Sequence, residues 1–181
     1  MRLFLTGFMG AGKTTVGRHL AARLGREFVD LDEEVERRAG MSVRRIFETL
    51  GEPEFRRLEA EELQRAAARD EVVVATGGGT VCFPANARLL RARGITVWLN
   101  PSFATLGARI GAGSKEDRPL FRDETQALAL YRQRLPAYRA AADLAVEVGP
   151  AEAAEEVAAR IVLRLGVRPA GRGTDGTPSI D

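Results

Sequence analysis

One segment constrains the fold of this chain more than any other. Residues 7–14 read GFMGAGKT and match the phosphate-binding pattern G-x-x-x-x-G-K-[ST] in full. The largely apolar residues 2–6 before it are typical of a short buried strand, and Val16, Leu20 and Leu24 after it recur with the spacing of one helix face. The motif therefore lies between a strand and a helix, which is where a P-loop belongs.

The residues of this loop suit a polyphosphate. Its glycines allow successive backbone N–H groups to turn inward, and the helix that follows adds unpaired N–H groups and its positive dipole end. Lys13 is expected to reach the β- and γ-phosphates, and the Thr14 hydroxyl to ligate Mg²⁺. We therefore predict a site for ATP or GTP with magnesium. The predicted nucleotide-binding residues of the loop are Gly10, Ala11, Gly12, Lys13, Thr14 and Thr15.

Composition limits what the rest of the chain does. Its 181 residues, 45% of them hydrophobic, are enough for one domain with a core. Lys and Arg number 27 against 25 Asp and Glu, and aromatic residues make up only 6%, so we expect no nucleic-acid partner. Since no stretch approaches 18 apolar residues and no leader pattern precedes the first strand, we expect a cytoplasmic protein without a membrane partner. A monomer is the default expectation.

The chain has one cysteine and one histidine, so neither an internal disulfide nor a zinc site is expected. Cys82 lies near an apolar strand end and is expected to be a buried thiol. His19 falls in the middle of the helix after the P-loop and is expected at the surface.

Strands and helices alternate along the chain. Apolar runs predict strands at residues 2–6, 27–30, 71–76, 95–99 and 144–148. Helices are predicted from the P-loop to residue 25, at 33–39, 43–50, 52–69, 86–93, 102–110 and 123–142, and around 157–165. This alternation predicts an α/β fold of the P-loop NTPase type, with a five-stranded parallel sheet flanked by helices on both faces.

Two segments lack the features of packed structure. Residues 111–121 begin glycine-rich and charged without periodicity, so we expect a mobile lid there. Residues 167–181 offer little to bury, so we expect a disordered C-terminal tail. Residues 1–166 are then a single domain.

Polar residues and glycines follow two of the predicted strands. Asp30 and Asp32 come at the end of the second strand, where they also suit the first turn of a helix. Residues 77–79 are three glycines at the end of the third strand, which would expose backbone N–H groups to a ligand or simply form a turn. No acidic residue ends the strand at 71–76, so Asp30 and Thr14 must hold the metal.

Six short motifs in order resemble the shikimate kinase family over residues 1–166. They are GFMGAGKT at 7–14, DLD at 30–32, GEPEFRRLE at 51–59, GGG at 77–79, RPL at 118–120 and RLPAY at 134–138. The resemblance implies a fold like that of nucleoside monophosphate kinases. It also implies transfer of the γ-phosphoryl group of ATP to the 3-hydroxyl of shikimate, a step of aromatic amino-acid biosynthesis.

The resemblance also implies roles for individual residues. Arg56 and Arg134 would bind the shikimate carboxylate, while the amides of Gly78 and Gly79 would meet the substrate. Asp32 would contact the reacting hydroxyl, and Asp30 would help to hold Mg²⁺. Lys13 and Arg118, the latter from the lid, would act on the transferring phosphate. Arg109 would pack on adenine, and residues 148–150 would form the adenine loop. Separately from the resemblance, Glu59 lies one helical turn after Arg56, so its carboxylate is expected to hold the Arg56 guanidinium.

Some alternatives stay open at this level. An ordinary Asp, with a pKa of about 3.9, is a weak base for an alcohol, so Asp32 is expected to orient the hydroxyl and accept its proton late. Val43, Phe47 and Phe55 suit an apolar wall for the substrate ring and the protein core equally well. The alternative functions are another small-metabolite kinase, such as a gluconate kinase, and a nucleotide-dependent binding module without catalysis. Intact Lys13, Asp32 and Arg118 disfavour the binding module.

Overall fold

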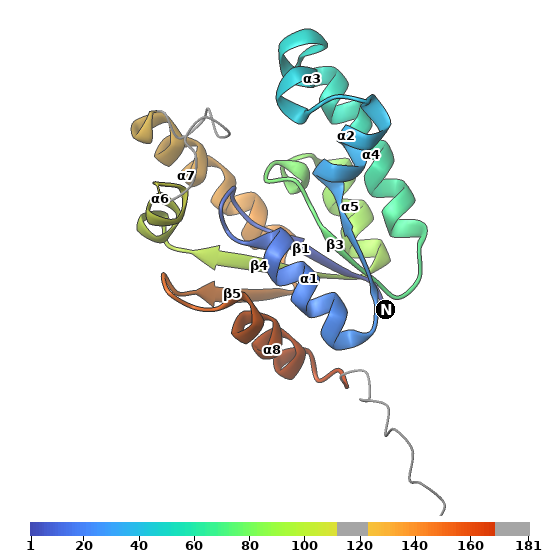
Figure 1. The fold of residues 1–181 in the computed structure, drawn as a ribbon, viewed down its shortest axis with the longest axis vertical. Coiled ribbons are helices and arrows are strands. Elements are labelled where there is room, and N and C mark those ends of the chain that lie inside the picture. The colour runs from blue at the N-terminus through green and yellow to red at the C-terminus, as the bar shows by residue number, and fades with distance from the viewer. Residues whose placement is uncertain (112–122, 169–181) are drawn as a thin grey trace, which may run out of the picture.

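The computed structural model in Figure 1 describes residues 1–111 and 123–168. Its strands are β1 (Leu3–Thr6), β2 (Glu27–Asp30), β3 (Val72–Ala75), β4 (Ile95–Pro101) and β5 (Leu144–Val148). All neighbouring strands pair in parallel, in the order β2-β3-β1-β4-β5. The predicted five-stranded parallel sheet is confirmed.

Helices cover the sheet on both sides (Figure 1). They are α1 (Lys13–Leu24), α2 (Leu31–Ala39), α3 (Val43–Thr49), α4 (Gly51–Ala68), α5 (Pro84–Arg93), α6 (Phe103–Gly111), α7 (Glu124–Ala141) and α8 (Ala154–Leu165), with a 3₁₀ turn, η1 (Thr80–Cys82). Helices α1 and α8 pack against each other, while α5 and α7 contact each other and β4. Two helices begin two residues earlier than predicted, because Asp30 caps α2 and Pro84 suits the first position of α5.

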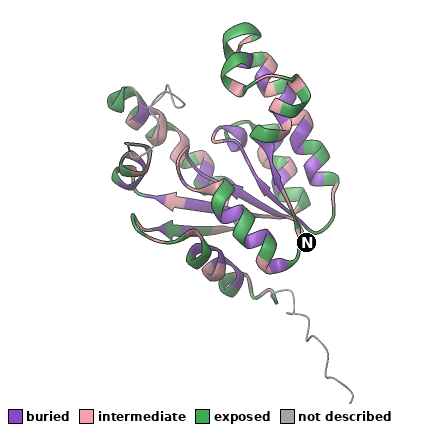
Figure 2. Cartoon of the chain, viewed as in Figure 1, coloured by how far each residue is buried: buried purple, intermediate pink, exposed green. Residues whose placement is uncertain are grey.

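The main core lies on both faces of the sheet. Strands β1 and β3 are buried along their whole length, as Figure 2 shows in purple. The predicted inner face of α1 is confirmed, since Val16, Leu20 and Leu24 are all buried. Such continuous apolar strands are typical of parallel sheets that helices cover on both faces.

A second, smaller core joins α2, α3 and α4. It consists of Val35, Ile46, Phe55 and Leu58. In Figure 1 these helices rise above the end of the sheet. The small helical unit formed by α2, α3 and α4 lies opposite the P-loop.

Four expectations from the sequence need comment here. Cys82 is exposed, so the prediction of a buried thiol was wrong: it lies at the end of η1, and its neighbours Thr80 and Val81 take the buried positions. His19 is exposed, as predicted. Val167 still packs against the main core. The lid lies outside the described residues except for its first residue, 111, and so do residues 169–181 of the tail.

Among the described residues, no helix is both long and apolar enough to cross a lipid bilayer.

Gly94 tests how tightly the sheet is packed where β4 begins. Its backbone is extended, with a φ of −176°, but a Cβ there would lie 2.5 Å from the Arg2 backbone oxygen. We expect Gly94→Ala to lower the free energy of unfolding by about 1–3 kcal/mol, measured by urea denaturation.

The control is Gly107→Ala in α6, where a Cβ would meet nothing within 4 Å. That change should raise the same free energy by about 0.5–1 kcal/mol. Equal effects of the two changes would contradict the packing explanation.

Candidate active site

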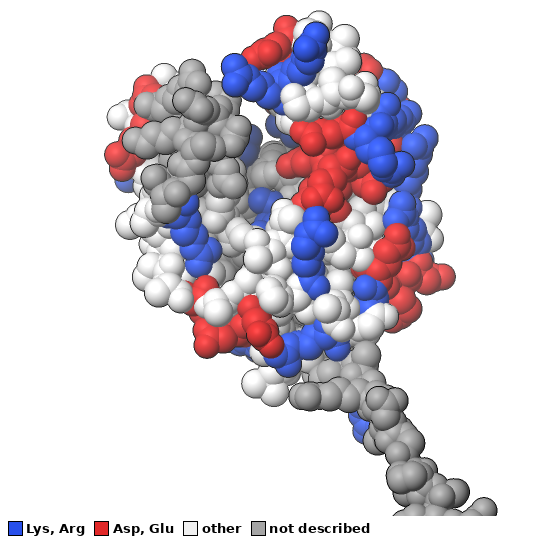
Figure 3. All heavy atoms as spheres, viewed as in Figure 1, with Lys and Arg blue, Asp and Glu red and all other residues white. Residues whose placement is uncertain are grey.

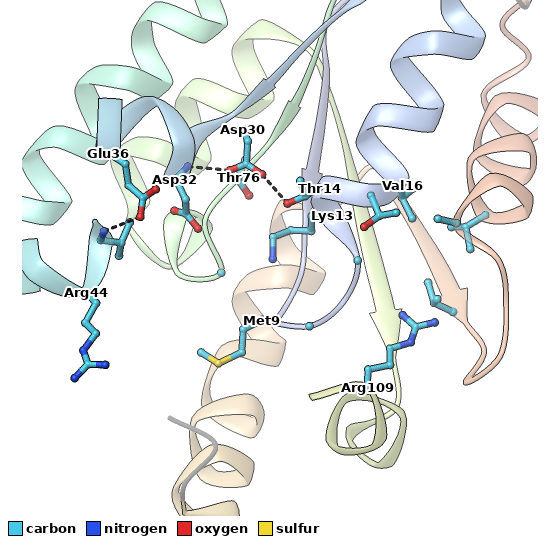
Figure 4. A pocket seen from close by; sticks show the side chains of 18 of the residues that line it. Met9, Lys13, Thr14, Val16, Asp30, Asp32, Glu36, Arg44, Thr76 and Arg109 are labelled. Atoms are coloured by element: carbon cyan, nitrogen blue, oxygen red, sulfur yellow. Dashed lines mark hydrogen bonds between the residues drawn. The ribbon is translucent and has the colours of Figure 1, made fainter. Parts of the chain in front are cut away.

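A cleft of about 1380 Å³ opens at the carboxyl ends of the strands. In Figure 4 the P-loop occupies its centre, with the Asp32 side on the left and Arg109 on the right. Ligands of open parallel sheets bind in this position. The residues discussed below that line the cleft are Gly10, Gly12, Lys13, Thr14, Thr15, Asp30, Asp32, Glu36, Val43, Phe47, Gly78, Arg109, Val148 and Pro150.

The P-loop depends on glycine at two positions in particular. Gly12 has a φ of 92°, and Gly7 has a φ of 143° with no room for a Cβ, which would lie 2.5 Å from the Leu99 backbone oxygen. Within this loop Lys13 Nζ donates to the Gly7 and Phe8 carbonyl oxygens at 2.9 and 3.2 Å. The Lys13 ammonium is thus held against the loop that is predicted to hold phosphate.

The other predicted nucleotide-binding residues of the loop differ in their placement. Gly10, Thr14 and Thr15 line the cleft. Ala11 is fully buried, and its N–H donates to the Phe8 carbonyl oxygen at 3.1 Å. The Ala11 amide is therefore committed to the turn itself in this structure.

Thr14 and Asp30 come together as the predicted metal pair. Thr14 Oγ1 donates to Asp30 Oδ2 at 2.6 Å, while Asp30 Oδ1 accepts the Asp32 N–H at 3.0 Å and caps α2. A hydroxyl and a carboxylate suit Mg²⁺, which prefers oxygen ligands and takes few of them from the protein when it also binds phosphate. No cluster of three or more His, Cys, Asp or Glu suited to a metal occurs in residues 1–111 and 123–168. The donor set fits Mg²⁺ that arrives with a nucleotide.

Asp32 has an unusual environment on the left of the cleft (Figure 4). The Asp32 carboxyl lies among other protein groups and loses hydration there, which raises its pKa from 3.8 to about 6. The residue as a whole is nevertheless exposed to the open cleft. The Lys13 ammonium lowers this pKa, and the Asp30, Glu59 and Glu36 carboxylates raise it. Asp32 is therefore a stronger base than the ordinary Asp expected from sequence.

Glu36 was missed by the sequence analysis. It lies one turn after Asp32 on α2, lines the cleft and accepts the Val43 N–H at 2.8 Å (Figure 4). It thereby ties the start of α3 to α2. The spacing of four residues after Asp32 was the available signal, because residues that far apart share a helix face.

Arg56 is held beside the triple glycine. Its Nη1 donates to Glu59 Oε2 at 2.9 Å, which confirms the expected pairing with Glu59. Glu59 is fully buried, and its other oxygen accepts from Thr80 Oγ1 at 2.7 Å. A Cβ on Gly79 would lie 2.9 Å from the Arg56 guanidinium. The guanidinium therefore fits beside this loop because residue 79 has no side chain.

Arg134 reaches the same loop from α7. A Cβ on Gly78 would lie 3.6 Å from its Nη1, so the triple glycine lies close to both predicted arginines. The Arg134 guanidinium also lies over the Phe8 ring, 5.8 Å from its centroid. Tyr138, one turn later and fully buried, donates its hydroxyl to the Gly78 carbonyl oxygen and so fixes the loop.

The opposite end of the cleft carries the predicted adenine contacts. Arg109 Nη2 donates to the Gly149 carbonyl oxygen at 2.7 Å, and Val148 and Pro150 line the cleft. Arg118, the predicted lid arginine, lies outside the described residues.

The three residues proposed for the apolar wall of the substrate site lie in different places. Val43 and Phe47 line the cleft, and Phe47 keeps 38% of its surface exposed. Phe55 is buried in the small helical core, and its ring centroid lies 4.7 Å from that of Phe47. Phe55 therefore supports the wall rather than forming it.

Comparison with known proteins identifies the family of this chain. The model of the shikimate kinase family matches residues 9–166. A shikimate kinase from Halorhodospira halophila is 44% identical over 171 residues, covering 93% of this chain and 95% of that protein. One from Bordetella avium is 45% identical over 152 residues, covering 81% of this chain and 71% of that protein.

Solved structures agree as well. The structure of shikimate kinase from Acinetobacter baumannii in complex with shikimate has a TM-score of 0.85 to this fold at 40% identity, and the match covers 91% of this chain and 93% of that one. Sequence, family model and fold lead to the same conclusion: the chain belongs to the shikimate kinase family.

Proposed function

We propose that the cleft at the carboxyl ends of the strands is where this member of the shikimate kinase family transfers the γ-phosphoryl group of ATP to the 3-hydroxyl of shikimate. The observation that carries the proposal is the convergence of two arginines, Arg56 and Arg134, on the triple glycine. Asp32 and the P-loop line the adjoining cleft. A planar guanidinium binds a carboxylate through two parallel hydrogen bonds, which suits an acid such as shikimate.

Asp32 receives the proton in this proposal. The hydroxyl oxygen forms its bond to the γ-phosphorus as the bond from phosphorus to the β-phosphate oxygen breaks, and the hydroxyl proton passes to the Asp32 carboxylate. The transition state is loose, so the proton moves late. A pKa of about 6 leaves Asp32 mostly ionised at neutral pH and basic enough to accept that proton.

The phosphate-binding groups act by position and charge. Lys13 would extend to the β- and γ-phosphates, and Thr14 with Asp30 would hold Mg²⁺, which would neutralise phosphate charge. Arg118 from the lid contacts the transferring phosphate, and Arg109 packs on adenine. The contact of Arg109 with the Gly149 carbonyl supports the adenine assignment, because it places the guanidinium beside the loop at 148–150.

We also propose a cytoplasmic monomer with no nucleic-acid partner. On the face shown in Figure 3, basic and acidic residues are interspersed and form no continuous basic field of the kind that binds nucleic acid.

Release of ADP tests the reaction and its substrate together. With Mg²⁺ and ATP, we expect shikimate to stimulate ADP release strongly, and gluconate and nucleoside monophosphates to leave it at the background rate. Gluconate is the sharpest control, because it is an acid whose kinases share this kind of P-loop. Stimulation by gluconate alone would contradict the proposal and support the main alternative, a gluconate kinase.

Asp32→Asn tests the proton acceptor. The amide keeps the shape but does not take up a proton, so kcat should fall by about 10²-fold or more while KM for ATP is unchanged. In the unaltered enzyme, kcat/KM for shikimate should fall as pH drops through about 6, because the ionised form of Asp32 is the active one. An Asn variant with normal kcat would rule out Asp32 as the acceptor.

Arg134→Ala tests carboxylate binding. Loss of a charge-assisted hydrogen bond should raise KM for shikimate by about 10–100-fold and leave KM for ATP unchanged. Steady-state kinetics with each substrate varied in turn measure both constants. If both constants rose equally, Arg134 would have a general structural role instead.

A further inference from the structure

Phe83 occupies a position that its local structure does not explain. It is the residue that caps the N-terminus of α5, where Ser, Thr, Asp or Asn would accept a backbone N–H, and its side chain makes no such bond. It also leaves 39% of its surface exposed. Positions that break a local rule in this way are concentrated at functional sites.

The Phe83 ring contacts the guanidinium of Arg56. The Arg56 Cζ lies 5.1 Å from the centroid of this ring and 5.0 Å from that of Phe55. Both distances fall within the range of a cation–π interaction, in which the negative face of the ring attracts the cation. Phe55 belongs to the buried core, whereas Phe83 comes from the turn that follows the triple glycine.

The other contacts of Arg56 leave part of the guanidinium available. Of its five N–H groups, Nε and Nη2 each donate one to the Glu52 carboxylate, at 3.1 and 3.0 Å, and Nη1 donates one to Glu59. In these bonds among the described residues, one N–H on each terminal nitrogen is not used. Glu52 restrains the guanidinium only weakly, since 59% of the Glu52 side chain is exposed. Glu59 is rigid but fixes only one nitrogen.

We propose that Phe83 is a positioning residue for substrate binding: its ring restrains the plane of the Arg56 guanidinium so that the two remaining N–H groups face the carboxylate of shikimate. The inference rests on the proposed role of Arg56. Phe83 acts through Arg56 and does not itself hydrogen-bond to the substrate. A guanidinium held in one orientation loses less conformational entropy when it binds a carboxylate than one that moves freely.

The test compares Phe83→Leu with Phe83→Tyr by isothermal titration calorimetry of shikimate. Leucine keeps an apolar side chain but has no π-face, so Kd should rise by about two- to fivefold. Tyrosine keeps the ring and should bind like the unaltered protein. At saturating shikimate kcat should be the same for all three proteins, as should KM for ATP.

The methyl ester of shikimate separates the two ways in which a ring could act. It lacks the carboxylate charge that Arg56 would bind, so its affinity should not differ between the leucine variant and the unaltered protein. An equal loss of affinity for shikimate and its ester would overturn the proposal, because the ring would then contact the substrate directly. Unchanged shikimate affinity in Phe83→Leu would overturn it as well.

Two further variants complete the design. Leu163→Ser changes an apolar residue of α8 that is 81% exposed, and it should leave shikimate affinity unchanged. Arg56→Lys separates this inference from the one it rests on. If Arg56→Lys weakens shikimate binding and Phe83→Leu does not, only the role of Phe83 fails. If Arg56→Lys binds shikimate normally, the proposed role of Arg56 fails, and the role of Phe83 fails with it.

Discussion

The common direction of the five strands is the constraint on which the rest of the structure depends. Because every strand points the same way, the chain leaves all five strands at the same end of the sheet. The first residues of several helices therefore lie together at that end. The P-loop and the triple glycine follow β1 and β3, and Asp30 is the last residue of β2. These three strands are neighbours in the sheet although they are far apart in sequence. The cleft is a consequence of this topology, and the side chains only adapt it to a ligand.

Glu59 is the second constraint. A fully buried carboxylate is costly unless it is paired, and here Thr80 and Arg56 each bond to one of its oxygens. The same carboxylate leaves no room for a side chain at Gly77, where a Cβ would lie 2.3 Å from Glu59 Oε1. One buried charge thus fixes the shape of the glycine loop and the position of the guanidinium beside it.

Most of the fold was predictable from the sequence, because buried parallel strands appear as apolar runs and the P-loop marks the first strand and helix. The site was predictable only in part. The P-loop and the arginine motifs identify residues, but the raised pKa of Asp32 depends first on loss of hydration in the folded protein and then on the Asp30, Glu59 and Glu36 carboxylates that the fold brings near it. Cys82 was misplaced because a 3₁₀ turn, not a strand end, sets its direction. No periodicity shows that the Phe83 ring reaches Arg56, since that contact joins a turn to α4.

The separate core of α2, α3 and α4 has a consequence for the stability of the molecule. This small core consists of four buried side chains, whereas α2 and α4 also contribute Leu31 and Leu63 to the far larger core on the two faces of the sheet. Local opening costs less free energy where fewer apolar contacts are lost, so α3 should open while the sheet remains folded. Amide hydrogen exchange would then be fast in α3 and slow in β1. A ligand bridging α3 and the P-loop would slow the faster exchange, and part of its binding free energy would be spent on local order.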